Sequence, residues 1–420
     1  MLLQILFFVV ILALLGVLVW QAREQRSVVV GLAVLIAFLP LGDIPLAENF
    51  RILGTAIMAV LIVCSFALNK SRQFTWQPIF YAIVGVYLLS IVGLLHSGCL
   101  SFANKRIDVS SPMIIFPVLF SMVQLSKRNV MLLLRFFVWI VILVCIYGLL
   151  SYAITVYEFS LKAALSDGKR FSHFFMVFPL AWHPSAFVIA LLMALPVSLY
   201  LRYHDGKQIT LVEMLLAILL PILVTFMVGA RIGVAVFPVL LGLGYFVYCK
   251  FKPTLKWGLA ASGVVAGLCV LFFVIPPDMK NHFSDQLRLD QRNIAISAIQ
   301  EKPILGWGTW TQHDLMSCEE RRERVGAKTS QVFSHFHNQY LDAMVQFGII
   351  GIAALLFLIG WIFWIAIRKK HFLLLSFMAM YVIVFYFDNV LHSINWVHVF
   401  MFWLCFLLAS QNHLVERKTQ

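Results

Sequence analysis

The sequence predicts an all-α polytopic integral membrane protein with one large helical loop outside the membrane. Of its 420 residues, 62% are hydrophobic and only 12% are charged, whereas soluble domains are about half apolar and about a quarter charged. Apolar runs long enough for membrane helices recur from one end of the chain to the other. Helices satisfy their own backbone hydrogen bonds in lipid, so these two observations exclude an ordinary soluble domain.

Thirteen apolar segments are candidate membrane spans. The second is short for a hydrocarbon core of about 30 Å, so we expect twelve or thirteen transmembrane helices. The first segment lacks both a basic leader and a small-residue cleavage site, and we interpret it as an anchor rather than a signal peptide. The candidates are residues 2–20, 28–41, 52–68, 77–95, 109–125, 130–155, 176–201, 211–228, 232–248, 255–275, 338–366, 372–387 and 394–411.

Charge between the segments predicts their orientation. The short basic loops NKSRQ, SKRN, RYHDGK, CKFKPTLK and IRKKH are typical of cytoplasmic loops. They also explain the net charge of +13 without a nucleic-acid partner. This orientation divides the chain into a helix bundle (1–275), a periplasmic loop or cap (276–336), and the last three spans with a cytoplasmic tail (337–420).

A second set of basic residues falls on the predicted outer side, where this rule does not expect it. One such charge is usually only solvated, but the set together could bind an anion. Arg231 interrupts an apolar stretch at a membrane boundary, so it faces either a cavity or the lipid headgroups, and we favour the cavity. The set comprises Lys105, Arg106, Lys169, Arg170, Arg231, Arg288 and Arg292.

The outer loop contains its own helix signal in DQRNIAISAIQEKP. Asp290 is the expected N-cap, and Pro303 lies beyond the expected end. At about 100° per residue, Arg292 falls within an apolar arc between Ile296 and Ile299. A guanidinium there needs a partner, which is either an internal salt bridge or a bound anion.

The stretch SHFHNQYLDAMVQFGIIG pairs a polar cluster with the start of an apolar run. On a continuous helix, Gly348 and Gly351 fall on nearly the same stripe as His337. Small residues spaced in this way allow a neighbouring helix to approach closely. We therefore expect a rigidly seated helix whose outer end presents His337, Asn338 and Tyr340.

The run from His337 to Gly351 matches the pattern H-[NSQ]-x9-G-x-x-[GTY], and the chain here resembles the bacterial O-antigen ligases. The many spans, the large loop before the last three, Arg231 in GARIGVAVFP and Arg292 in LDQRNIAISAIQ are also similar to that family. EKPILGWGTW looks like the P-x-x-G-x-G element of the larger ligase and polymerase superfamily. Ala235 departs from the Leu that often follows the boundary arginine.

The resemblance implies a glycosyltransferase that moves O-antigen from undecaprenyl diphosphate to a sugar hydroxyl of lipid A–core oligosaccharide. It implies an inverting reaction without metal or other cofactor, at the periplasmic face of the bacterial inner membrane. Arg231 and Arg292 suit the diphosphate because guanidinium binds phosphate through paired hydrogen bonds. His337 suits proton abstraction from the acceptor. We expect substrate binding by Lys105, Arg170, Arg288, Asn338 and Tyr340.

Three other functions remain open on the sequence. An O-antigen polymerase or a protein O-oligosaccharyltransferase would use the same donor with another acceptor. A transporter of the lipid-linked glycan would need charged groups at mid-membrane, whereas here the charges gather on one side.

Overall fold

The computed structural model describes residues 2–22, 25–38, 45–68, 73–97, 107–159, 184–203, 208–228, 231–248, 286–328, 335–392 and 394–414. These residues form helices, and no strand occurs among them. The predicted all-α class is confirmed for this part of the chain. The helices are α1 (Leu2–Gln21), α2 (Arg26–Phe38), α3 (Pro45–Leu68), α4 (Pro78–Val92), η1 (Gly93–His96), α6 (Pro112–Ser121), α7 (Lys127–Phe159), α10 (Pro184–Leu192), α11 (Ala194–Tyr203), α12 (Leu211–Val228), α13 (Arg231–Tyr248), α16 (Gln286–Glu301), α17 (Gln312–Ser317), α18 (Glu319–Arg324), α19 (Gln339–Arg368), α20 (Phe372–Phe387), η3 (Val390–His392), α21 (Ile394–Ala409) and α22 (Gln411–Leu414).

Three helical segments are long and apolar enough to cross a membrane: Pro78–His96, Lys127–Ile154 and Gln339–Arg368. Nine shorter apolar helices accompany them in the described residues. The predicted segment 255–275 lies outside the described residues, and the other candidate segments all overlap helices. The chain is therefore a helical membrane protein.

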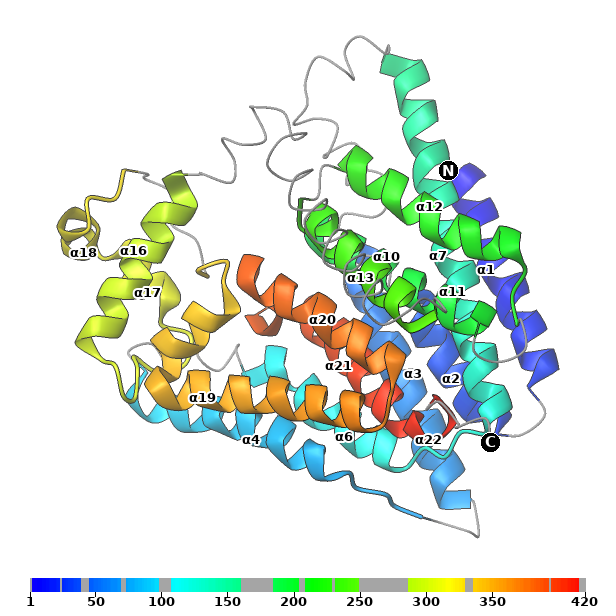
Figure 1. Ribbon diagram of the computed structural model, residues 1–420, viewed down its shortest axis with the longest axis horizontal. Helices are drawn as coiled ribbons and strands as arrows, with labels where there is room; N and C mark the ends of the chain where they lie inside the picture. The colour runs from blue at the N-terminus through cyan, green and yellow to red at the C-terminus, as the bar shows by residue number, and fades with distance from the viewer. Residues whose placement is uncertain are drawn as a thin grey trace.

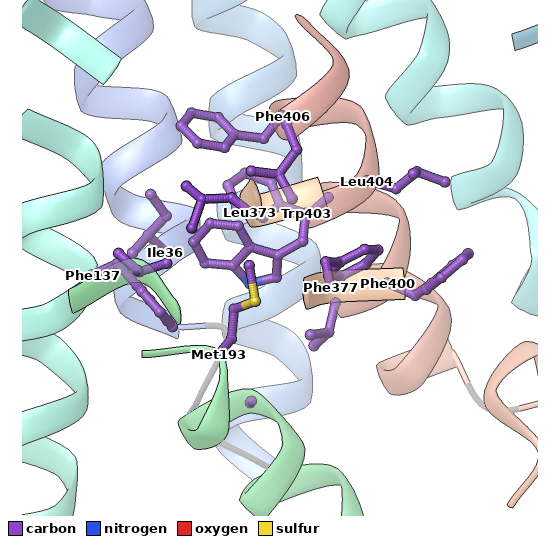
Figure 2. Close-up of a cluster of buried hydrophobic side chains, with 14 of the residues drawn as sticks. Ile36, Phe137, Met193, Leu373, Phe377, Phe400, Trp403, Leu404 and Phe406 are labelled. Atoms are coloured by element: carbon purple, nitrogen blue, oxygen red, sulfur yellow. The ribbon is translucent and has the colours of Figure 1, made fainter. Parts of the chain in front are cut away.

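Helix α21 forms the centre of the bundle. Its residues from Trp396 to Leu408 are all buried, so they contact other helices. Figure 2 shows Trp403 enclosed by side chains of several helices, among them Phe137 of α7 and Phe377 of α20. The Phe137 and Trp403 ring centroids lie 4.6 Å apart. Close packing of these large rings fixes the positions of α7, α20 and α21 relative to one another.

The described residues 286–328, which we call the cap, stand at one end of α19 on the left of Figure 1. They pack on α19 through a small hydrophobic core of their own, which includes Ile294, Ala298 and Val345. The Arg321 guanidinium donates two hydrogen bonds to the Glu301 carboxylate, at 3.0 and 2.8 Å, and this forked pair ties α18 to α16.

Helix α16 begins earlier than the sequence indicates. It starts at Gln286, so the expectation of Asp290 as its N-cap is wrong. The Asp290 carboxylate instead accepts hydrogen bonds from the Gln286 side chain (2.7 Å) and from the Lys328 backbone N–H (2.9 Å). A buried carboxylate needs such donors, and here it fastens the far end of the cap to α16.

Helix α19 is broken at Gly348, which has φ 59° and ψ −149°. The backbone N–H groups of Trp307 and Gly308 donate to the carbonyls of Val345 (2.8 Å) and Gln346 (2.9 Å), and the Ile349 N–H donates to the Pro303 carbonyl (2.9 Å). The turn after α16 thus supplies hydrogen bonds that the broken helix has lost.

This arrangement corrects the expected glycine stripe. A Cβ at Gly348 would collide with the Ile304 carbonyl oxygen, and one at Gly306 would lie 2.5 Å from the Gln346 carbonyl. The close approach therefore comes from the PILGWG turn rather than from a neighbouring helix. Gly348 is needed because its backbone conformation is almost restricted to glycine.

Candidate active site

Three histidines and a carboxylate meet where the cap joins the membrane helices. We call His335, His337, Asp388 and His392 the histidine cluster. The His337 Nδ1 atom lies 3.6 Å from Asp388 Oδ1, with the two side chains 16% and 9% exposed. The His335 ring centroid lies 4.2 Å from that of His337 and 5.1 Å from that of His392. A partly accessible imidazole therefore faces a nearly buried carboxylate.

The ends of two membrane helices place this pair. Asn338 is the N-cap of α19, and its side-chain oxygen accepts hydrogen bonds from the N–H groups of Tyr340 and Leu341, both at 3.0 Å. Asp388 ends α20, where its own N–H donates to the Val384 carbonyl at 2.8 Å. Capping satisfies the open backbone groups at a helix start, so His337 sits on a fixed terminus.

Trp310 covers the cluster from the cap. Its ring stacks on that of His392 at a centroid distance of 4.2 Å and an angle of 17°. The backbone N–H of Trp310 donates to Gln346 Oε1 at 3.1 Å, and Gln346 Nε2 in turn donates to Asp342 Oδ2 at 2.6 Å. This buried network connects the position of Trp310 to the first turns of α19.

The backbone is strained at two residues of this site. Among the described residues, four that are not glycine have positive φ, and these include Trp310 (63°) and His337 (49°). Such conformations cost on the order of 1–3 kcal/mol and persist where surrounding contacts enforce them, often at functional sites. The strain supports a functional role for the histidine cluster.

The geometry suits proton abstraction. A carboxylate beside Nδ1 favours the tautomer with the proton on Nδ1, and this leaves Nε2 as the proton acceptor. Asp388 Oδ1 also accepts a hydrogen bond from the Asn389 N–H at 2.8 Å, which holds the carboxylate in place. His337 can thus act as a base and Asp388 as the residue that orients it.

The same atoms could also hold a metal ion. One donor atom each from His335, His337 and Asp388 lie within 4.8 Å of one another. Two imidazoles and a carboxylate are a ligand set that zinc accepts. A metal bound there would occupy the side chain that we assign as the base, so the two uses exclude each other.

The structure describes the predicted basic site residues to different extents. Arg288 and Arg292 are exposed on α16, and no ion pair of Arg292 occurs within the described part of the chain. Arg231 is the first residue of α13, and its side chain lies outside what the structure describes, so the expectation that Arg231 and Arg292 bind the diphosphate stays a prediction. Lys105 and Arg170 lie outside the described residues.

The predicted apolar arc of α16 is narrower than expected. Its buried residues are Asp290, Gln291, Ile294, Ala295 and Ala298, whereas Ile296 is exposed. Arg292 lies one turn before Ile296 on that exposed stripe. The arginine is therefore accessible to a ligand in water rather than held inside an apolar interface.

Two further predicted residues use their polar atoms within the protein. The Asn338 oxygen caps α19, as described above. The Tyr340 hydroxyl donates to the Val382 carbonyl at 3.1 Å, and its ring packs against Phe385. Both residues orient the start of α19 against α20. Their predicted contact with substrate stays a prediction.

Sequence reasoning missed Asp388, His335, His392 and Trp310. A signal for Asp388 was present in FYFDNVLHSINW, because it is a lone acidic residue between two apolar segments. Ionisable residues at such positions usually serve function, and the same argument had singled out Arg231. Trp310 gave no comparable signal, because its role depends on how the turn docks on α19.

Fold and site together define a helical membrane protein with a histidine–carboxylate pair at the junction of its membrane helices and its cap. Residues 216–356 match the family model described as O-Antigen ligase, and the predicted resemblance is confirmed. The matched range covers less than half of the chain and includes Arg231, Arg292 and His337. Asp388 lies beyond the matched range.

The chain is also similar to one curated protein whose description names no activity. It is described as an uncharacterized protein of Haemophilus influenzae and is 29% identical over 161 residues. The match covers 34% of this chain and spans 40% of the relative's length.

Proposed function

We propose that this protein is an O-antigen ligase. It transfers O-antigen polysaccharide from undecaprenyl diphosphate to a sugar hydroxyl of lipid A–core oligosaccharide. The observation that carries the proposal is the His337–Asp388 pair, in a chain whose residues 216–356 match the O-antigen ligase family. The proposed location is the bacterial inner membrane, with the histidine cluster on the periplasmic side.

The geometry of the His337–Asp388 pair supports the proposed reaction. His337 Nε2 takes the proton of the acceptor hydroxyl while Asp388 faces Nδ1, 3.6 Å away. The acceptor oxygen then forms a bond to the anomeric carbon of the donor, and the bond from that carbon to the diphosphate oxygen breaks. Attack opposite the leaving group inverts the anomeric centre. A positioned base of this kind contributes about 10²–10⁴-fold to rate.

In this proposal, basic side chains stabilise the negative charge of the diphosphate leaving group. Undecaprenyl diphosphate departs as an anion, and guanidinium groups stabilise such charge through forked hydrogen bonds. Arg292 and Arg288 are exposed on the same helix, and α16 packs on α19, the helix that begins beside His337. We assign Arg231, Arg292 and Arg288 to the diphosphate, with Arg170 and Lys105 as further contributors.

A deletion strain tests the proposal against the polymerase alternative. Loss of a ligase should leave lipopolysaccharide that consists of core alone, while lipid-linked polymer accumulates. Core bearing a single repeat would instead identify a polymerase. Complementation with His337→Ala should fail, whereas His313→Ala should restore the wild-type banding, because His313 is an exposed histidine on α17 of the cap.

A further inference from the structure

A basic pocket lies where the end of α1 meets the start of α7. Its volume is about 470 Å³, and its polar lining comes from Gln21, Lys127, Arg128, Arg135 and Gln208. The Arg128 guanidinium donates to the Gln21 carbonyl at 3.2 Å, which holds one wall of the pocket together. The volume is within the range of about 300–1,000 Å³ typical of ligand sites.

Among the residues that the structure describes around this pocket, basic side chains outnumber acidic ones. Lys127, Arg128 and Arg135 line it, while Glu213 approaches Arg135 at 3.4 Å. The Glu213 side chain is 10% exposed and that of Arg135 is 45% exposed. Glu213 also forms a capping box with Thr210, since each backbone N–H donates to the other side chain. The Glu213 carboxylate therefore serves mainly to cap the start of α12.

An apolar cavity of about 240 Å³ continues from the basic pocket. The two share Gln21, Leu132 and Arg135, and the apolar cavity then follows α1 and α7 past Val17 and Trp139. Val17 and Trp139 are 51% and 36% exposed, so this groove opens on the outer surface of the bundle. A cationic pocket at the head of an apolar groove matches the shape and chemistry of a phospholipid.

The pocket shares no residue with the histidine cluster. Gln208 and Glu213 mark the start of α12, and the 18 residues of this helix lead away to Arg231. A helix of that length spans about 27 Å. The loops that flank the pocket, SKRN and RYHDGK, are those that charge predicts to be cytoplasmic.

We propose that this pocket binds an anionic glycerophospholipid of the cytoplasmic leaflet. Its phosphate contacts Lys127, Arg128 and Arg135, and one acyl chain lies in the groove beside Trp139. Basic pockets between membrane helices on this side recognise acidic lipid headgroups. The inference is independent of the proposed ligase reaction, because it uses other residues at another end of the bundle.

Quenching of Trp139 by a brominated lipid tests the site. Full-length protein in non-ionic detergent is titrated with phosphatidylglycerol that carries brominated acyl chains, and Trp139→Phe defines the part of the quenching that comes from the groove. Lys127→Gln/Arg128→Gln should weaken the apparent affinity about 30-fold, because each basic residue near a membrane surface contributes about fivefold. This variant keeps the Arg135–Glu213 pair, and its unfolding temperature is compared with that of wild type to show that it folds.

Three controls test the specificity of the site. Lys369→Gln, at the end of α19, should leave the affinity unchanged. Brominated phosphatidylcholine should quench Trp139 much more weakly, and inorganic phosphate should fail to displace phosphatidylglycerol. Equal quenching by the two lipids, or full displacement by phosphate at matched concentration, would overturn the proposal, as would unchanged affinity in Lys127→Gln/Arg128→Gln.

Discussion

Replacing Gly348 with alanine should damage both the stability and the activity of the protein. Gly348 has φ 59° and ψ −149°, and an alanine in that conformation costs about 1–3 kcal/mol. The new Cβ would also collide with the Ile304 carbonyl and push the PILGWG turn away from α19. Three backbone hydrogen bonds cross this contact, each with a net value of about 0.5–1.5 kcal/mol.

The combined loss for Gly348→Ala is therefore about 1–3 kcal/mol if all three hydrogen bonds survive and about 2.5–7.5 kcal/mol if none does. Gly360→Ala is the matched control, because Gly360 lies in the same helix with open space around it. That change should stabilise α19 by up to about 1 kcal/mol, since alanine favours a helix interior.

Unfolding of both variants in detergent, with the rate of glycan transfer, measures these effects. Gly348→Ala should unfold at a lower temperature than wild type and transfer glycan slowly, because the displaced turn carries Trp310 away from His392. Equal stability and equal rates for Gly348→Ala and Gly360→Ala would refute the assigned role of the turn.

Further predictions concern the site itself. Arg292→Ala should abolish transfer by purified protein and Arg292→Lys should restore little of it, because lysine lacks the planar fork; full activity in Arg292→Ala would remove this residue from the site. Trp310→Phe should retain most of the transfer rate and Trp310→Leu should lose it, since the stack on His392 needs a ring; equal rates would show that packing alone matters. A chelator should leave the wild-type rate unchanged while added Zn²⁺ inhibits, and His335→Ala should weaken that inhibition; loss of activity on chelation would contradict the metal-independent reaction.

Helix positions were largely predictable because lipid leaves the chain few alternatives. The predicted segments 372–387 and 394–411 correspond to α20 and α21, whose bounds are Phe372–Phe387 and Ile394–Ala409. The predicted segment 176–201 was less accurate, since helix α10 ends at Leu192 and α11 begins at Ala194. Hydrophobicity fixes where a span lies, but it does not encode a break within it.

The active-site predictions divide in a similar way. His337 was proposed because it stands in a spaced motif, whereas Asp388, which lies beside it in the structure, follows it by 51 positions along the sequence. No local pattern shows that the end of α20 meets the start of α19. Gly348 was noticed for its size, whereas its role depends on a backbone conformation that spacing cannot reveal.

The central claim is that His337 and Asp388 act as one unit that deprotonates the acceptor. Single-turnover transfer from purified lipid-linked glycan to lipid A–core should be compared for wild type, His337→Ala, Asp388→Ala and the double variant. We predict that His337→Ala slows transfer by about 10²–10⁴-fold and that added imidazole restores part of the rate. The double variant should be no slower than His337→Ala alone, because residues that act together are not additive. A wild-type rate in Asp388→Ala, or losses that multiply in the double variant, would contradict the account.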